Sequence, residues 1–264
     1  MAHEIDFTTG KAAIAYTGAK PWHGLGQMVD PNASVQEWRD TAGLNWEALR
    51  TVVTYYNAVK GETTADESKY VLYRSDTGNP LSIVSAGYKP VQPAEILDFF
   101  GALAKSGAFQ IETVGSLKQG RRIWALARVG ENARILDDEV APYLMLATSY
   151  DGSMATIAKF TSVRVVCNNT LQASLRNAAG KNQLAISHQT VFDAQSVRQE
   201  LGIALDSWDE FKIKANRMAK TKVTSEVVDT WLQELLEPYA ESPEKVKQSK
   251  GYMAILNLFH DGQL

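Results

Sequence analysis

Between residues 109 and 167 the sequence alternates between short apolar or β-branched runs and turns. The runs are FQIETVGSL, RRIWALARV, PYLMLATSY, SMATIAKF and SVRVVC, and the breaks include KQG and the acidic stretch DDE at 137–139. Runs of this length with turns between them indicate strands joined in chain order. YDGS at 150–153 is a typical hairpin turn. This segment therefore predicts a largely antiparallel β-meander.

Helical patterns flank the meander. Ser34 is a candidate N-cap with Glu37 at the capping-box position, and residues 92–107 have apolar residues at helical spacing. A further helix is expected over 169–180, and the chain from about residue 192 is helical in pattern. The fold class expected is α+β: a central, largely antiparallel β-meander packed by helices, with a helical C-terminal region.

The expected organisation has three parts. Residues 1–30 hold glycines and prolines spaced too closely for regular structure and predict an irregular N-terminal arm. Residues 31–190 form the α+β core domain, and residues 191–264 form a helical region packed on it. Early in the core, ALRTVVTYYNAV predicts a strand, GETTADES a turn and KYVLYRSDTGNPLSIVSAGY a hairpin.

Composition limits the function classes. The net charge is −3, yet residues 108–190 carry 9 Lys and Arg against 6 Asp and Glu, so a local basic surface is expected on an acidic protein. One cysteine and four scattered histidines give no zinc-like spacing. A chain with one cysteine forms no intramolecular disulfide, which favours the cytoplasm of a bacterial cell. No apolar run approaches the ~20 residues that span a bilayer, so no membrane partner is expected.

Several stretches resemble one protein family when taken in order. They are PWHGLG (21–26), AGLNWEA (42–48), YRSDTGNPLSIVSAGYKPVQPAEILDFF (73–100), GSLKQGRRIWALARV (115–129) and TSYDGSMATIAKFTSVRVVCNNTLQASL (148–175). Together they resemble the phage/plasmid-like proteins with a domain of unknown function. Pro93 departs from the asparagine common there. The resemblance implies a mobile-element setting, and the meander followed by a helix is similar to the core of single-strand annealing proteins, an analogy of fold alone.

The strand RRIWALARV suggests a ligand-binding face. Alternation places Arg122, Trp124, Leu126 and Arg128 on one side. Guanidinium groups beside an indole suit single-stranded nucleic acid, which needs charge for phosphates and a flat ring for bases. The residues predicted to bind nucleic acid are Lys118, Arg121, Arg122, Trp124, Arg128, Lys159 and Arg164. The alternative is an amphipathic strand with Trp124 in the core and solvated arginines beside it.

Other chemistry-bearing residues have structural alternatives. His23 in PWHGLG suggests a general base, but an arm whose Trp22 fills an apolar groove is favoured. Asp76, Glu112, Asp151 and the 137–139 cluster are candidate Mg²⁺ ligands, although most fall in predicted turns, where acids are common. Cys167 is either a nucleophile or a core residue. Alternation groups it with Val163 and Val165, opposite Arg164, which favours the core.

Three functional hypotheses follow. The first is a non-enzymatic phage or plasmid protein that binds single-stranded DNA, with strand annealing in recombination as its activity, working as a homo-oligomer without a cofactor. The second is a factor that binds a host or phage protein to counter host defence or regulate replication of a mobile element. The third is a metal-dependent nuclease. No Walker-type loop, GxSxG elbow or HExxH pattern occurs, so nothing favours ATP hydrolysis, acyl transfer or zinc proteolysis.

Overall fold

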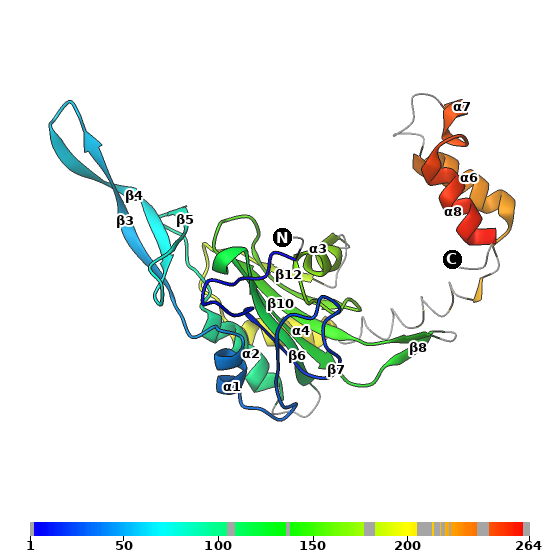
Figure 1. The fold of residues 1–264 in the computed structure, drawn as a ribbon, viewed down its shortest axis with the longest axis horizontal. Helices are drawn as coiled ribbons and strands as arrows, with labels where there is room; N and C mark the ends of the chain where they lie inside the picture. Colours follow the sequence, from blue (N-terminus) through cyan, green and yellow to red (C-terminus); the bar gives the residue numbers. More distant parts are fainter. Residues whose placement is uncertain are drawn as a thin grey trace. The chain divides into compact units, whose positions relative to one another are not determined.

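The computed structural model describes residues 3–104, 109–135, 138–176, 183–204, 213, 217, 220, 221, 223–236 and 243–260. The chain divides into two units, Met1–Lys212 and Ile213–Leu264. Strands and helices occur together in the first unit and helices in the second (Figure 1), which confirms the α+β class.

A seven-stranded sheet forms the centre of the first unit, in the order β12-β11-β10-β7-β6-β1-β2. Its neighbours are antiparallel except β1 and β2, which are parallel. From β6 to β12 the strands of this sheet are neighbours in chain order, so the meander is confirmed. The strands are β1 (Ile14–Tyr16), β2 (Gln27–Met28), β6 (Phe109–Leu117), β7 (Arg122–Val129), β10 (Tyr143–Ser149), β11 (Thr156–Thr161) and β12 (Gln183–Ile186). A small hairpin, β8 (Ala133–Ile135) and β9 (Asp138–Val140), interrupts the chain between β7 and β10.

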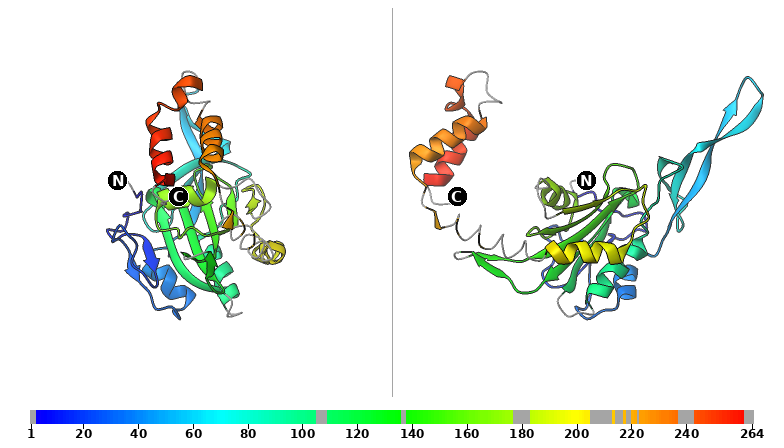
Figure 2. Two further views of the ribbon diagram at one scale, coloured as in Figure 1. Left: turned by 90° about the vertical axis from the view of Figure 1, so that its right-hand side faces the viewer. Right: turned by 180° about the vertical axis from the view of Figure 1, so that it is seen from behind.

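Helices cover both faces of this sheet (Figure 2). One face, with Ile123 and Ala125 of β7, shares a core with α1 (Val35–Thr41), α2 (Pro93–Ala104) and α4 (Ala194–Ala204). The other face, with Trp124 and Leu126, packs against α3 (Asn168–Arg176) and the segment before it. The predicted alternation of β7 is therefore correct, and both of its faces are buried. The predicted capping box of α1 also forms, since Ser34 and Glu37 exchange hydrogen bonds.

The run SVRVVC is not a strand, contrary to prediction. Residues 162–167 cross the α3 face of the sheet without joining a ladder, and Val165, Val166 and Cys167 are buried there. Side chains satisfy part of this backbone, because the Val165 carbonyl accepts hydrogen bonds from Thr113 Oγ1 (2.6 Å) and Trp124 Nε1 (3.1 Å). The apolar pattern thus reports burial, and the prediction that Cys167 lies in the core is confirmed. The strand at the edge of the sheet next to β11 is β12, a strand that was not predicted from the sequence.

The N-terminal arm is more regular than predicted. Ile14–Tyr16 is a buried strand that pairs with β6 on one side and with β2 on the other. Gly26 approaches β1 so closely that a Cβ atom there would lie 2.7 Å from Ile14 Cγ2. Gly26, one of the glycines that suggested irregular structure, has a φ of 105° and permits this tight parallel pairing of two very short strands.

A second sheet of the first unit has the order β3-β4-β5, with β3 (Ala48–Asn57), β4 (Glu62–Arg74) and β5 (Pro80–Ser85). GETTADES is not a turn, contrary to prediction, because most of it lies in β4. The turn comes earlier, over residues 58–61, and ends at Gly61 with a φ of 69°. No residue from 49 to 71 is buried, and β3 and β4 leave the rest of the unit as a narrow ribbon (Figures 1 and 2).

The second unit contains α6 (Ser225–Leu236), α7 (Pro243–Val246) and α8 (Lys250–His260), which confirms the helical C-terminal region. Its small core consists of Val228, Leu232, Val246 and Tyr252. The earlier helix α4 belongs to the first unit, where Val197 enters the core. In the part of the chain that the structure describes, no helix is both long and apolar enough to cross a membrane.

Candidate nucleic-acid interface

The structure scatters the predicted nucleic-acid-binding residues over the interior and both ends of the large sheet. Trp124 is fully buried, and its Nε1 donates to Thr113 Oγ1 (3.2 Å) and to the Val165 carbonyl. Its indole has no exposed face on which a base could stack. The prediction that Trp124 contacts nucleic acid is therefore corrected. Trp124 lies in the core, as the alternative interpretation of this strand expected.

Lys159 also lies inside the protein. Its ammonium group donates to the Ser174 carbonyl at 2.6 Å, in the last turn of α3. The carbonyls of that turn have no partner within the helix, and a cation there is favourable. Burial lowers the pKa of Lys159. The side chain is 5% exposed, so it is placed to stabilise the end of a helix and not to contact a phosphate.

Arg164 is held by an acid. Its Nε forms an ion pair with Glu112 Oε1, and its Nη2 donates to the Thr17 carbonyl (3.0 Å). Tyr143 donates to the same Glu112 oxygen at 3.1 Å, and burial together with this carboxylate raises the pKa of Tyr143 to about 12. Glu112 points to this cluster because it sits at a β-bulge between Ile111 and Thr113. The cluster neutralises the charge of Arg164.

Arg128 lies at the opposite end of β7 from Arg122. The two residues are six positions apart in an extended strand, which corresponds to roughly 20 Å. Arg128 donates to Asn132 in the following loop. With Trp124 and Leu126 buried between them, the two arginines do not form one continuous surface.

The three remaining residues, Lys118, Arg121 and Arg122, lie together at the turn between β6 and β7. The turn is tight: Lys118 and Gln119 adopt left-handed backbone conformations, with φ values of 54° and 61°. Arg122 donates to Ser153 Oγ (3.0 and 3.2 Å) and to Asn168 Oδ1 (3.3 Å). Arg121 is exposed, and no described side chain is bonded to its guanidinium group.

The N-terminal arm adds an aromatic group to this end of the sheet. Trp22 is 68% exposed and does not fill a groove, contrary to the favoured prediction. Its ring packs edge-on against His3 (centroids 4.7 Å apart) and His23 (5.5 Å). His23 Nδ1 accepts from the Leu25 amide (3.1 Å), so its Nε2 carries the proton and donates to the Val166 carbonyl (3.0 Å). His23 therefore serves to hold the arm in place.

Asn168, the first residue of α3, joins the two groups. Its backbone amide donates to the His3 carbonyl (3.1 Å), while its side chain accepts from Arg122. Figure 1 shows the N-terminus beside α3. We call this group the sheet-end site; its members are His3, Trp22, His23, Lys118, Arg121 and Arg122.

Two carboxylates border the sheet-end site. Glu4 lies 3.5 Å from Lys118 Nζ, and both side chains are about one-third exposed. Burial works against ionisation of Asp151, but hydrogen bonds from Ser153 and the charge of Arg122 keep the pKa of Asp151 below its ordinary value. Among the described residues, neither Arg121 nor Arg122 forms an ion pair with these carboxylates. The site can therefore offer an exposed indole and guanidinium groups to an anionic, aromatic ligand.

The candidate Mg²⁺ ligands do not converge. Asp76 pairs with Arg74, Glu112 with Arg164, and Asp151 lies in the β10–β11 turn. Asp137 lies outside the described residues, and the side chain of Asp138 is likewise not described. Among the described residues, no three His, Cys, Asp or Glu side chains form a group that could hold a metal ion.

The structure also contains a buried ion pair that nothing in the sequence predicted. Arg74 and Asp6 are 1% and 2% exposed and meet at 2.6 Å, although 68 positions separate them in the chain. Asp76 completes the pairing of the Arg74 guanidinium group, which also lies 4.5 Å from the Trp46 ring. A Cβ atom on Gly120 would lie 3.1 Å from Arg74 Nη1. The ion pair thus ties the N-terminal arm to the end of β4, beside Gly120 of the β6–β7 turn.

Comparison with known proteins gives a family match. The family model of a domain of unknown function, DUF932, matches residues 80–264. This range includes Arg121, Arg122 and Asn168 of the region described above, while His3, Trp22 and His23 precede it. No curated protein and no solved structure matches the chain.

Proposed function

The chain belongs to the DUF932 family, which is defined by a domain of unknown function, and we propose that it binds single-stranded DNA through the sheet-end site. In this proposal it is a phage or plasmid protein acting in the bacterial cytoplasm, with annealing of complementary strands as its activity. The observation that supports it is Trp22, whose indole is 68% exposed although two imidazole rings hold it in place.

An indole held in this way suits the stacking of bases. Each stacked base contributes about 1–3 kcal/mol, and every base has a flat face, so such binding tolerates any sequence. Because His3 and His23 already restrict Trp22, the ring loses little conformational freedom on binding. Bases in a duplex are stacked on one another, and the site therefore favours single strands.

The cations of the sheet-end site would bind the phosphates. Arg121 is exposed, and the Arg122 guanidinium is oriented by Ser153 and Asn168. Each phosphate that is neutralised releases counterions, which makes the affinity depend on salt. A backbone that runs across the β6–β7 turn would bring its bases to the indole.

The test is a fluorescence-polarisation titration with a labelled single-stranded oligonucleotide of about 20 nucleotides. This is longer than the roughly 4–16 nucleotides that a single-strand-binding OB-fold domain covers. Trp22→Ala should weaken binding by roughly 5- to 150-fold, the loss of about one stacked base. Trp231→Ala is the matched control, because Trp231 is also exposed, at 56%, but lies in the second unit. It should bind like the parent protein.

The salt dependence tests the cations separately. The affinity falls as salt rises. Arg121→Ala with Arg122→Ala should make the plot of log affinity against log salt less steep, by roughly 0.7 for each phosphate that the protein no longer neutralises. A correctly folded Trp22→Ala protein that binds as the parent does would refute the stacking site. Failure of the parent protein to bind any oligonucleotide at low salt would refute the function itself.

A further inference from the structure

The N-terminal arm brings a carboxylate to the sheet-end site. A bridge and two backbone hydrogen bonds (2.8 and 2.9 Å) join residues 4–6 to residues 116–118 at the end of β6. Asp6 is anchored further by the buried ion pair described above. One of the two hydrogen bonds runs from the Lys118 amide to the Glu4 carbonyl, so the backbone of Glu4 is fixed beside Lys118.

The backbone is strained at this contact. Glu4, Lys118 and Gln119 have φ values of 52°, 54° and 61°, and they are the three residues other than glycine with a positive φ among those that the structure describes. Residues with side chains adopt such conformations rarely, and they keep them where the surrounding structure enforces them. Strain of this kind is concentrated at functional sites, and here it lies on the two residues of one ion pair and on their neighbour.

The side chains of Glu4 and Lys118 also meet. Glu4 Oε2 lies 3.5 Å from Lys118 Nζ, and both side chains are about one-third exposed. This oxygen is shielded from solvent, and it accepts no hydrogen bond from the described residues. The carboxylate therefore occupies the position that a phosphate would need in order to pair with Lys118.

Glu4 has two advantages over a phosphate in the competition for Lys118. A group tethered to the same chain acts at a high effective concentration. Its backbone is already ordered, so the ion pair forms with little further loss of conformational freedom. A strand that displaced the carboxylate would also leave it beside other phosphates, and like charges in contact repel one another.

The two arginines of the site have no such acidic partner. Arg122 is bonded to the uncharged side chains of Ser153 and Asn168. No described side chain is bonded to the guanidinium group of Arg121, which is exposed. The three cations of the site are therefore not equivalent, because a carboxylate of the arm is paired with Lys118 alone among them.

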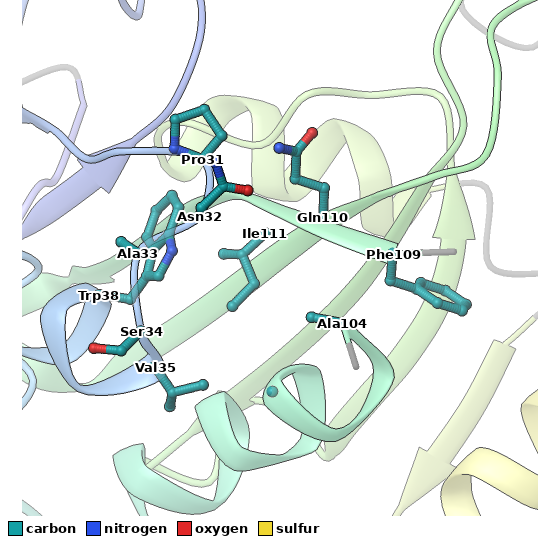
Figure 3. Close-up of a pocket in the computed structure, with 11 residues that line it drawn as sticks. Pro31, Asn32, Ala33, Ser34, Val35, Trp38, Ala104, Phe109, Gln110 and Ile111 are labelled. Carbon is teal, nitrogen blue, oxygen red and sulfur yellow. The ribbon is translucent and has the colours of Figure 1, made fainter. Parts of the chain in front are cut away.

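The hollow at the other end of β6 is not an alternative place for phosphates (Figure 3). It has a volume of about 600 Å³, and its lining includes residues 31–35, Trp38 and the start of β6. None of the described residues in this lining is charged. The phosphates of a bound strand are therefore expected at the arginines of the sheet-end site, beside Lys118.

We propose that Glu4 masks Lys118 from the phosphates of a bound strand, an inference that rests on the proposed function of the sheet-end site. The indole and the two arginines then hold the strand, while Lys118 stays with the carboxylate of the arm. The mask lowers the affinity of the site, and differences in affinity of this kind act mostly through faster release. Release suits strand annealing, because a protein that pairs two strands must afterwards leave both.

The salt dependence of oligonucleotide binding by Glu4→Gln measures the mask. Once it is free, Lys118 should neutralise one more phosphate, so the plot of log affinity against log salt should become steeper by roughly 0.7. The advantage of this variant over the parent should accordingly shrink by roughly 2.6-fold between about 50 and 200 mM salt. Glu234→Gln is the control for the change in net charge, because Glu234 is exposed in the second unit, and it should bind as the parent does.

A double variant separates masking from simple repulsion. If Glu4 acts by holding Lys118, the steeper slope requires that lysine, and Glu4→Gln with Lys118→Gln should lose it. If Glu4 only repels the strand, the gain in affinity persists without Lys118, and the proposal is wrong. Circular dichroism should show that every variant is folded, because an exposed ion pair contributes little to stability.

Inorganic polyphosphate keeps this inference separate from the proposed function, because it carries negative charge without bases. Calorimetric titration should show that Glu4→Gln binds polyphosphate more tightly than the parent does, and that the double variant loses this gain. A parent protein that binds no oligonucleotide would refute the function, while the polyphosphate titration still decides whether Lys118 is masked. An affinity of Glu4→Gln equal to that of the parent for both probes would overturn the proposal.

Discussion

Among single residues, His188 is expected to make the free energy of unfolding depend on pH. Its ring is 8% exposed and stacks on Tyr88 (centroids 4.5 Å apart), and its two nitrogens face the Lys89 and Met154 carbonyls at 3.3 Å each. Burial lowers the pKa of His188, and the two carbonyls only partly oppose this. The imidazole is therefore neutral in the folded protein at pH values where the unfolded chain begins to bind a proton.

The sign of the pH effect follows from this difference. His188 takes up its proton near pH 6.5 in the unfolded chain and at lower pH in the folded protein. The unfolded state binds more protons between these values, so stability is lost as the pH falls below about 6.5, with a slope of at most about 1.4 kcal/mol per pH unit.

His188→Gln removes this titration. Urea unfolding at pH 8 should show a loss of about 1 kcal/mol for the variant, the value of a typical buried hydrogen bond. Because the parent protein alone is penalised by acid, the difference between the two proteins should shrink as the pH is lowered to 5. A difference that stays constant over this range would show that His188 does not titrate between the two states.

Local residue patterns predict some of these positions and not others. The Ser34–Glu37 capping box and the buried Cys167 follow from local sequence and are confirmed. The exposure of Trp22 does not follow, because it depends on His3, which lies 19 positions away, and on the Val166 carbonyl that holds His23. The Arg74–Asp6 ion pair is still less visible, since contacts between distant positions leave no periodic signal in one sequence.

At the scale of elements, β7 shows the limit of the alternation rule. The rule correctly separates Trp124 from Ile123 and Ala125, but it does not say which face is open to solvent. Both are covered here, one by helices and the other by α3 with residues 162–167. The covering segment SVRVVC has a strand-like composition because it is buried, and β propensity mainly reports such burial.

The packing of β6 against β7 provides a prediction for this sheet. Gly115 faces Trp124 directly, and a Cβ atom at this position would lie 2.2 Å from the Trp124 ring. Gly115→Ala should therefore lower the free energy of unfolding by about 1–3 kcal/mol, the usual cost of overpacking.

Gly87→Ala is the matched control for this change. A Cβ atom on Gly87 would meet no other atom within 4 Å, and Gly87 does not adopt the left-handed conformation. In chemical denaturation, the free energy of unfolding of the Gly87→Ala protein should stay within about 1 kcal/mol of the parent value. Equal effects of both substitutions would show that the Trp124 ring moves aside without cost.

At the scale of the whole molecule, the described apolar residues form separate cores in the two units. A chain that ends at Lys212 should keep the thermal transition of the first unit within about 2 °C, which corresponds to less than 1 kcal/mol at this size. Near-ultraviolet circular dichroism of the shortened and full-length proteins measures this. A much lower transition would show that residues 213–264 contribute to the stability of the first unit.

The fold class and the strand order of the meander were predictable because neighbouring strands are joined by short local turns. The place of β1 was not predictable. Three residues are too short for a clear pattern, and β6, the antiparallel partner of β1, is far along the chain. The sheet-end site depends on this same pairing, which explains why the sequence suggested its arginines but not its aromatic group.

The pairing of β1 with β6 also sets an order of events during folding. Ile14 is matched with Gly115, so the first strand to leave the ribosome must wait for the synthesis of roughly 100 residues and close a loop of that length. The meander, by contrast, grows through local contacts, which form quickly. We expect Trp22 to reach its place late, after β6 and β7 have paired, so that a nascent chain acquires its sheet before it acquires the sheet-end site.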